Sequence, residues 1–337
     1  MIREAIAKLV QGQHLAEEEA REAMNEIMSG QATDAQIGAF VTGLRMKGET
    51  VEEITGCARV MREKVTRVSS GRPLLVDTCG TGGDGGGTFN ISTAAAFVVA
   101  GAGLPVAKHG NRAVSSRAGS ADCLEALGVK LDIGPEAAGA CLDEVGICFL
   151  FAPAYHSAFK YVIGPRKEIG IRTVFNVLGP LTNPAGAHAQ VIGVYEPGLV
   201  DLIPGVLRAL GSRAAYVVHG GDGLDEFTLA GETLVGELRD GQVRRLVMNP
   251  VDLGLAPASR EALRGGTAEE NAAILREVLE GCKGPRRDTV LANAALAITA
   301  GGLSGDLQAG VEAAARSIDS GAAWEMLAQL VAFTSRA

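Results

Sequence analysis

The residues best suited to chemistry lie in a stretch that is rich in glycine. Six of the eight residues from Gly80 to Gly87 are glycine, and Asp84 lies among them. Without Cβ atoms the backbone can turn tightly and bring its N–H groups close to a ligand. Asn90, Ser92 and Thr93 follow where a helix is expected to begin, and a helix start offers unpaired N–H groups and a positive dipole end. This pattern predicts a site for a phosphate or diphosphate group.

Two other interpretations of the glycine stretch are weaker. Gly80, Gly82 and Gly85 have the spacing of the dinucleotide fingerprint, which also requires an acidic residue about 20 positions further on. Lys108 and His109 occupy that region instead, so a nicotinamide dinucleotide site is disfavoured. A simple turn is disfavoured too, because six glycines cost more backbone entropy than a turn needs.

A second polar segment runs from Lys108 to Asp122, after a predicted strand and before a predicted helix. It combines cations, amide or imidazole groups and hydroxyls with many small residues. We interpret it as a further part of the anion site. A plain polar connection is the alternative.

A third segment, 164–184, carries Arg166 and Arg172 before the rigid Gly-Pro and Asn-Pro pairs that end at Pro180 and Pro184. The planar fork of a guanidinium suits a carboxylate, so either arginine could bind a carboxylate ligand. A structural salt bridge explains them equally well.

A fourth segment, from His219 to Glu226, follows an apolar strand and places Asp225 beside Glu226. Adjacent carboxylates repel unless a cation lies between them, and hard oxygen ligands suit Mg²⁺. The alternative is a helix start or an exposed turn.

The overall composition narrows the possible classes of function. The chain has 337 residues and a formal net charge of −8, which argues against binding to nucleic acid or to an acidic membrane. The six cysteines show no metal-ligand spacing and no disulfide pattern, so we expect reduced thiols and a cytoplasmic protein. The N-terminus begins a polar helix pattern instead of a signal peptide. We therefore expect no membrane contact.

The hydrophobic pattern predicts two kinds of structure. Residues 1–66 indicate three or four amphipathic helices, with capping boxes at Thr33 and Thr50 and breaks near Gly12, Gly30 and Gly48. After residue 74, apolar runs alternate with helical segments, which is typical of a parallel sheet covered by helices. The predicted strands are 74–77, 105–108, 130–133, 147–151, 189–194 and 214–219, followed by a hairpin of 233–238 and 243–247. The predicted helices are 92–102, 120–127, 135–145 and 199–210, with further helices beyond 268 that end at 322–333.

Taken in order, these segments resemble the anthranilate phosphoribosyltransferase family. The matching motifs are Gly-Thr-Gly-Gly-Asp from Gly80, Asn-x-Ser-Thr from Asn90, Lys-His-Gly-Asn-Arg from Lys108, Gly-Ser-Ala-Asp from Gly119, Arg-Thr-x-Phe-Asn-x-Leu-Gly-Pro from Arg172 and Gly-Leu-Asp-Glu to Glu226. The resemblance implies an α/β fold of the nucleoside phosphorylase type, with a small all-helical N-terminal domain and a larger α/β domain whose central sheet is mostly parallel. It implies domains of 1–68 and 69–337, with the segment 164–184 joined to the first, and a homodimer formed through the helical domain.

The resemblance also implies a reaction and its site. The enzyme would transfer a phosphoribosyl group from phosphoribosyl diphosphate to anthranilate in tryptophan biosynthesis, with Mg²⁺ as cofactor, two ions per subunit. His109 is a candidate catalytic residue. The implied phosphoribosyl diphosphate site comprises Gly80, Gly83, Asp84, Thr88, Asn90, Ile91, Ser92, Thr93, Lys108, His109, Gly110, Asn111, Arg112, Ala113, Val114, Ser115, Ser116 and Ser120. The implied anthranilate site comprises Gly80, Asn111, His156, Arg166 and Pro180, and the implied metal ligands are Ser92, Asp225 and Glu226.

Three alternatives remain open at this point. A pyrimidine nucleoside phosphorylase shares the architecture but does not need the acidic pair Asp225 and Glu226. A related transferase could use another aromatic acceptor. A non-catalytic protein could bind a phosphorylated ligand as a regulator.

Overall fold

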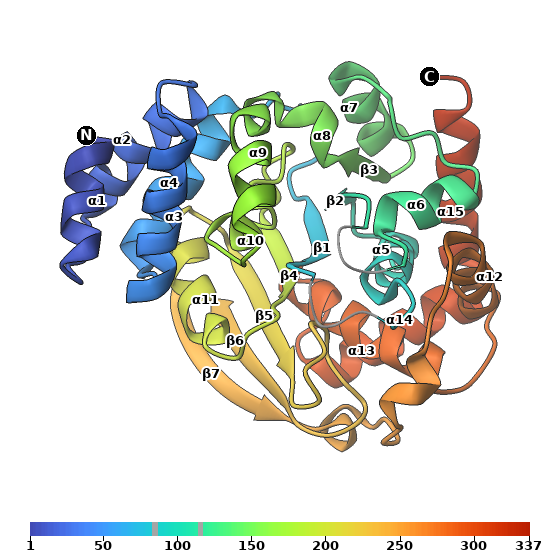
Figure 1. Cartoon of the computed structure of the whole chain (residues 1–337). Helices are drawn as coiled ribbons and strands as arrows, with labels where there is room; N and C mark the ends of the chain where they lie inside the picture. Colours follow the sequence, from blue (N-terminus) through green and yellow to red (C-terminus); the bar gives the residue numbers. More distant parts are fainter. Residues whose placement is uncertain (83–86, 114–116) are drawn as a thin grey trace.

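The computed structural model describes residues 1–82, 87–113 and 117–337, and it begins with four helices, drawn in blue in Figure 1. They are α1 (Ile2–Val10), α2 (Glu17–Met28), α3 (Asp34–Lys47) and α4 (Val51–Lys64). Both predicted capping boxes are present, since Thr33 and Thr50 accept hydrogen bonds from the N–H groups of Gln36 and Glu53. The helical start that the sequence predicted is therefore confirmed.

A mixed sheet forms the centre of the rest of the chain, in the order β3-β2-β1-β4-β5-β6-β7. Its parallel strands are β1 (Val76–Gly80), β2 (Val106–Gly110), β3 (Ile147–Phe151), β4 (Ala189–Gly193) and β5 (Ala214–Gly220). The antiparallel strands are β6 (Thr233–Arg239) and β7 (Gln242–Met248). Asp240 and Gly241 form the predicted turn between them, with φ of 52° and 73°.

Helices cover the sheet on both faces, so its parallel strands are buried on both sides. Neighbouring residues of one strand, Val191 and Ile192, belong to two different core clusters. The first cluster lies under α5 (Ile91–Gly101), α6 (Ser120–Ala126), α7 (Pro135–Glu144), α12 (Ala268–Leu279), α13 (Pro285–Ala300), α14 (Leu307–Asp319) and α15 (Ala322–Thr334). The second joins the four N-terminal helices to α11 (Leu199–Ala209) and to the opposite face of the sheet.

Three helices follow β3: α8 (Ala152–Tyr155), α9 (Lys160–Ile169) and α10 (Phe175–Leu178). The last two lie against the N-terminal helices, and α9 runs beside α3 in Figure 1. Val162 of α9 and Phe175 of α10 are buried in the same core cluster as the N-terminal helices. The segment after β3 thus connects that helical bundle to the edge of the sheet.

One predicted strand, 130–133, is wrong. Residues 129, 131 and 133 are buried and alternate with exposed ones, but the segment pairs with no strand in the described ranges. The Lys130 N–H donates instead to the Thr334 hydroxyl, at 3.2 Å, and the Ile133 carbonyl accepts from Tyr155. Alternating burial shows that one side of an extended segment faces the core, and it does not by itself show sheet pairing.

The described residues show neither a disulfide bond nor a helix that could span a membrane. All six cysteines are free, and five of them are buried. In the part of the chain that the structure describes, every helix is too short or too polar to cross a membrane.

Candidate active site

The candidate site lies where the carboxyl ends of the parallel strands meet. β1, β2, β4 and β5 end at Gly80, Gly110, Gly193 and Gly220, and the loops that follow carry most of the residues singled out in the sequence. In open α/β sheets this edge is where ligands bind.

A buried lysine provides the positive charge at this edge. Lys108 is only 3% exposed, its Nζ donates to the Thr78 carbonyl, and it lies 3.5 Å from the Ser92 hydroxyl. Burial lowers the pKa of Lys108, while the negative charge of Asp77 opposes this effect. Lys108 therefore links β1, β2 and the start of α5.

Asp77 is a buried partner that the sequence analysis missed. Its carboxylate accepts hydrogen bonds from the His109 N–H at 3.1 Å and from the Asn183 amide at 2.8 Å. Burial raises the pKa of Asp77 to about 6, and Lys108 opposes the rise. The sequence did carry a signal for Asp77, since it is a single acidic residue within an apolar strand. A charge is buried in such a strand only when it is paired, so a partner for Asp77 could have been expected.

The acidic pair contacts the glycine segment and the start of α5. Asp225 accepts a hydrogen bond from the Gly82 N–H at 2.9 Å, and Glu226 accepts one from the Ser92 N–H at 3.0 Å. Burial, followed by the charge of Asp225, raises the pKa of Glu226 to about 8, and Lys108 and Ser92 oppose the rise. The sequence alternative of an exposed turn is thus wrong for Glu226, which is 8% exposed.

These oxygen atoms suit a hard cation. No group of three or more His, Cys, Asp or Glu side chains gathers within residues 1–82, 87–113 and 117–337. Mg²⁺ usually binds through one or two carboxylates together with the phosphates of a substrate. Ser92, Asp225 and Glu226 fit that pattern, since a buried carboxylate with a raised pKa gains from a cation.

A row of rings leads from β2 to α10. The ring centroids of His109 and His156 are 5.1 Å apart, those of His156 and Phe159 are 6.2 Å apart, and those of Phe159 and Phe175 are 5.8 Å apart. Burial lowers the pKa of His109 to about 3, with His156 adding to the effect, and it lowers the pKa of His156 to about 4. Both imidazoles are neutral near pH 7, and within the described residues their buried Nε2 atoms have no hydrogen-bond partner.

Arg166 lies at the far end of this row. Its guanidinium carbon is 5.3 Å from the centroid of Phe159 and 5.5 Å from that of Phe175. Burial lowers the pKa of Arg166, although a guanidinium stays charged. No carboxylate of the described residues forms an ion pair with it. The row therefore places a cation against the faces of two aromatic rings.

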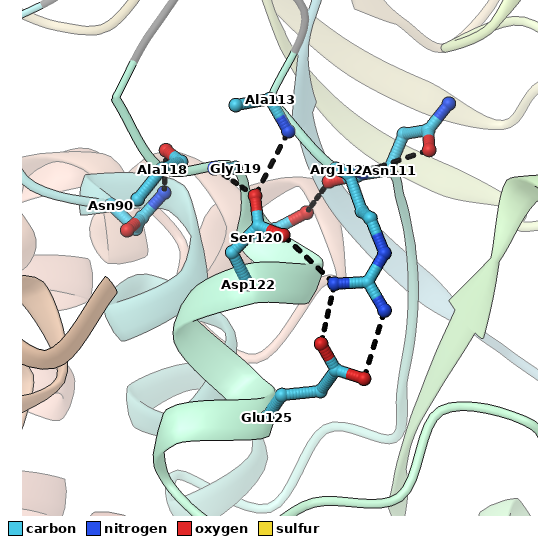
Figure 2. A network of polar contacts seen from close by, with 9 residues as sticks. All are labelled: Asn90, Asn111, Arg112, Ala113, Ala118, Gly119, Ser120, Asp122 and Glu125. Atoms are coloured by element: carbon cyan, nitrogen blue, oxygen red, sulfur yellow. Dashed lines mark hydrogen bonds and ion pairs between the residues drawn. The ribbon is translucent and has the colours of Figure 1, made fainter. Parts of the chain in front are cut away.

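The segment after β2 is held against α6, as Figure 2 shows. The Arg112 guanidinium pairs with Glu125 through both nitrogens and donates to Asp122 at 2.9 Å. The Ser120 hydroxyl donates to the Asn111 carbonyl at 3.2 Å. The Arg112 guanidinium thus lies against α6, whereas the Arg112 backbone follows directly after β2 at the edge of the sheet.

The remaining expected residues take the following positions. Asn90 precedes α5, and Ile91, Ser92 and Thr93 form its first turn. Thr88 forms an isolated bridge with Arg264, and Pro180 is buried after α10. Five expected residues lie outside the described ranges: Gly83, Asp84, Val114, Ser115 and Ser116.

Gly80 and Gly193 allow the loop that carries Asp225 and Glu226 to lie close to the ends of β1 and β4. A Cβ on Gly193 would lie 1.6 Å from the Asp225 carbonyl oxygen, and one on Gly80 would lie 2.8 Å from an Asp225 carboxylate oxygen. The role of Gly193 had no signal in the sequence, because it depends on a contact with a distant loop.

Known proteins match this chain along nearly its whole length. The family model "Glycosyl transferase family, a/b domain" matches residues 72–324, and "Glycosyl transferase family, helical bundle domain" matches residues 3–65. The anthranilate phosphoribosyltransferase of Pelotomaculum thermopropionicum is 60% identical over 334 residues, which are 99% of this chain and 97% of the relative.

Solved structures agree with the sequence matches. The crystal structure of anthranilate phosphoribosyltransferase from Thermus thermophilus has a TM-score of 0.94 and 46% identity, over 99% of each chain. The Saccharomyces cerevisiae protein in complex with PRPP and Mg has a TM-score of 0.90 and 29% identity, over 100% of this chain and 98% of that one. The same yeast protein in complex with 4-fluoroanthranilate has a TM-score of 0.89 and 28% identity, with the same coverage.

We expect Gly193→Ala to lower the free energy of unfolding by about 3 kcal/mol, because the new methyl group would displace the backbone at Asp225. Urea denaturation measures this change. Gly198→Ala is the control, since no atom lies within 4 Å of its Cβ position, and its effect should stay below about 0.5 kcal/mol. Equal effects of the two substitutions would contradict the close approach.

Proposed function

The chain belongs to the anthranilate phosphoribosyltransferase family, and we propose that it transfers the phosphoribosyl group of 5-phospho-α-D-ribose 1-diphosphate to the amine of anthranilate. The products are N-(5-phosphoribosyl)anthranilate and diphosphate, in tryptophan biosynthesis. The observation that carries this proposal is that Lys108 and Ser92, at the carboxyl ends of the strands, lie next to a row of rings that leads to Arg166.

The donor occupies the anion site in this proposal. The described residues of the glycine segment, the first turn of α5 and Lys108 to Ala113 offer N–H groups, hydroxyls and one buried cation. Backbone N–H groups and a helix start bind phosphate without a basic surface, which fits a chain with a net charge of −8. The yeast relative, solved with PRPP and Mg, supports this choice of donor.

Ser92, Asp225 and Glu226 would hold Mg²⁺, and we propose two ions per subunit. When bound, Mg²⁺ neutralises negative charge that gathers on the leaving diphosphate. Glu226 is ionised more readily with a cation beside it, because burial and Asp225 otherwise raise its pKa to about 8.

Anthranilate lies along the ring row, with its carboxylate toward Arg166. A guanidinium can bind both oxygens of a carboxylate, and Phe159 and Phe175 limit the freedom of Arg166. Gly80, Asn111, His156 and Pro180 complete the acceptor site in this proposal. The yeast relative, solved with 4-fluoroanthranilate, supports an acceptor of this class.

The protein then acts mainly by positioning and by electrostatics. As the bond from C1′ to the diphosphate breaks, Lys108 and the N–H groups at the start of α5 stabilise the departing charge. The ring row and Arg166 hold the amine toward C1′ in this proposal and so supply proximity. His109, with a pKa of about 3, is a weak base, and we assign it to orienting the acceptor rather than to removing a proton.

In this proposal residues 1–68 and the segment 164–184 form the helical domain, and the other residues of 69–337 form the α/β domain. Two chains pair through the helical domain. The protein is cytoplasmic. Exposed apolar side chains on three neighbouring helices support the pairing: Val10 is 78% exposed, Met46 84% and Ile163 59%. Free, mostly buried thiols fit a reducing compartment. Analytical ultracentrifugation should give twice the chain mass of 34.7 kDa, and a single-chain mass at micromolar concentration would refute the pairing.

The reaction itself is tested by the fluorescence of anthranilate. Protein, Mg²⁺ and phosphoribosyl diphosphate should make this fluorescence fall with time, because the product no longer carries the free amine. Omitting the donor, or chelating the metal with EDTA, should stop the decrease. If the complete mixture shows no decrease and no diphosphate release, the proposed function is wrong.

We expect Arg166→Ala to raise the KM for anthranilate about 10- to 100-fold, since the carboxylate loses a charge-assisted hydrogen bond worth roughly 1.5–3 kcal/mol. The KM for phosphoribosyl diphosphate should change little. Initial rates measured against each substrate separate the two constants. Lys167→Ala, which removes an exposed neighbouring charge, is the control, and an equal rise of both constants in Arg166→Ala would count against the assignment.

A further inference from the structure

Asp122 lies at the centre of the network in Figure 2. One of its carboxylate oxygens accepts hydrogen bonds from the Ala113 N–H at 3.0 Å and from the Gly119 N–H at 2.8 Å. The other accepts from Arg112 at 2.9 Å. A single side chain of α6 therefore ties together the two described ends of the segment between β2 and α6.

The same two ends also touch directly. A Cβ on Gly119 would lie 2.4 Å from the Ala113 nitrogen, and the Asn111 carbonyl accepts from the Ser120 hydroxyl and from the Ala121 N–H, both at 3.2 Å. The two stretches of backbone pass so close to each other here that other hydrogen-bond acceptors have little room to reach the N–H groups of Ala113 and Gly119. The Asp122 carboxylate accepts from both N–H groups instead.

A second connection ties this crossing to the start of α5. The Asn90 amide donates to the Ala118 carbonyl at 3.3 Å and accepts from the Asn271 amide at 3.0 Å. Asn271 in turn accepts from the Gly266 N–H at 2.7 Å and is buried in α12. The orientation of Asn90, which belongs to the proposed donor site, thus depends on where the 117–120 backbone lies.

The charge of Asp122 is stabilised where it lies. Burial raises the pKa of Asp122, but the N–H groups of Ala113 and Gly119 and the Arg112 guanidinium outweigh it, so the pKa lies below its ordinary value. Glu125 holds the same guanidinium from its other side. The carboxylate is therefore ionised and fully engaged near neutral pH.

We propose that Asp122 is a positioning residue for the donor. By holding Ala113 and Gly119 together, it sets the backbone of Asn111 to Ala113 and the contact that aims Asn90, although it touches no substrate itself. This inference rests on the proposed function. It adds a residue that links the two donor-binding blocks, one at the start of α5 and the other after β2.

The test compares Asp122→Ala and Asp122→Asn with the wild type. We expect Asp122→Ala to raise the KM for phosphoribosyl diphosphate tenfold or more and the KM for anthranilate by a clearly smaller factor, because Asn111 is the only residue of the proposed acceptor site in the backbone that Asp122 holds. The kcat should change less than threefold. Asp122→Asn should raise the donor KM less, because its oxygen can still accept from the two N–H groups while its NH₂ faces Arg112. Calorimetric titration with phosphoribosyl diphosphate and Mg²⁺ should show the same order of affinities.

Asp252→Asn is the matched control. Asp252 accepts from the Asn249 N–H at 2.7 Å in the same capping position of another short helix (Pro250–Leu253), and its loss should leave both KM values unchanged. If the Asp122 variants lose Tm, kcat and both affinities together, Asp122 is merely structural and the proposal is wrong. If the donor KM does not change, it is wrong as well. A wild type without turnover would instead refute the proposed function.

Discussion

The burial of one cation beside two carboxyl groups is the constraint on which the candidate site depends. Lys108 is buried in β2, where burial lowers its pKa and the negative charges of Asp77 and Glu226 oppose that change. Lys108 in turn opposes the rise that burial causes in the pKa of each carboxyl group, which reaches about 6 for Asp77 and about 8 for Glu226. The proposed metal ion would lower the pKa of Glu226 further, so the lysine and the metal would act together to keep this acid ionised.

The second part of the site works by different physics. Its neutral imidazoles and phenylalanine rings provide apolar surface, and its only charge, Arg166, is at the end. In the proposed reaction, an ionic donor and an aromatic acceptor would meet at the boundary between these polar and apolar surroundings.

Local signals in the sequence predicted much of this structure. The capping boxes at Thr33 and Thr50, the turn at Asp240 and every predicted strand except 130–133 depend on neighbouring residues and are present. The glycine stretch and the polar segments likewise indicated an anion site at the strand ends. Such features can be predicted because backbone geometry and residue type are linked locally.

Other features depend on contacts between distant residues and had no local signal. Residues 129–133 look like a strand but find no partner, and Gly193 must be small only because Asp225 lies against it. Asn271 reaches the site from a helix that no motif marks. Motifs therefore indicate where a candidate site lies, whereas its supporting residues can be identified only from the packed fold.

The order of strands in the sheet also has a consequence for how the protein is made. Val76 of β1 pairs with Ala189 of β4, so the central pair of the sheet joins segments that leave the ribosome far apart in time. At roughly 5–20 residues per second, β1 waits for several seconds with one edge unpaired. During translation, the strand that leads into the glycine stretch therefore keeps one edge open longer than any other interior strand of the sheet.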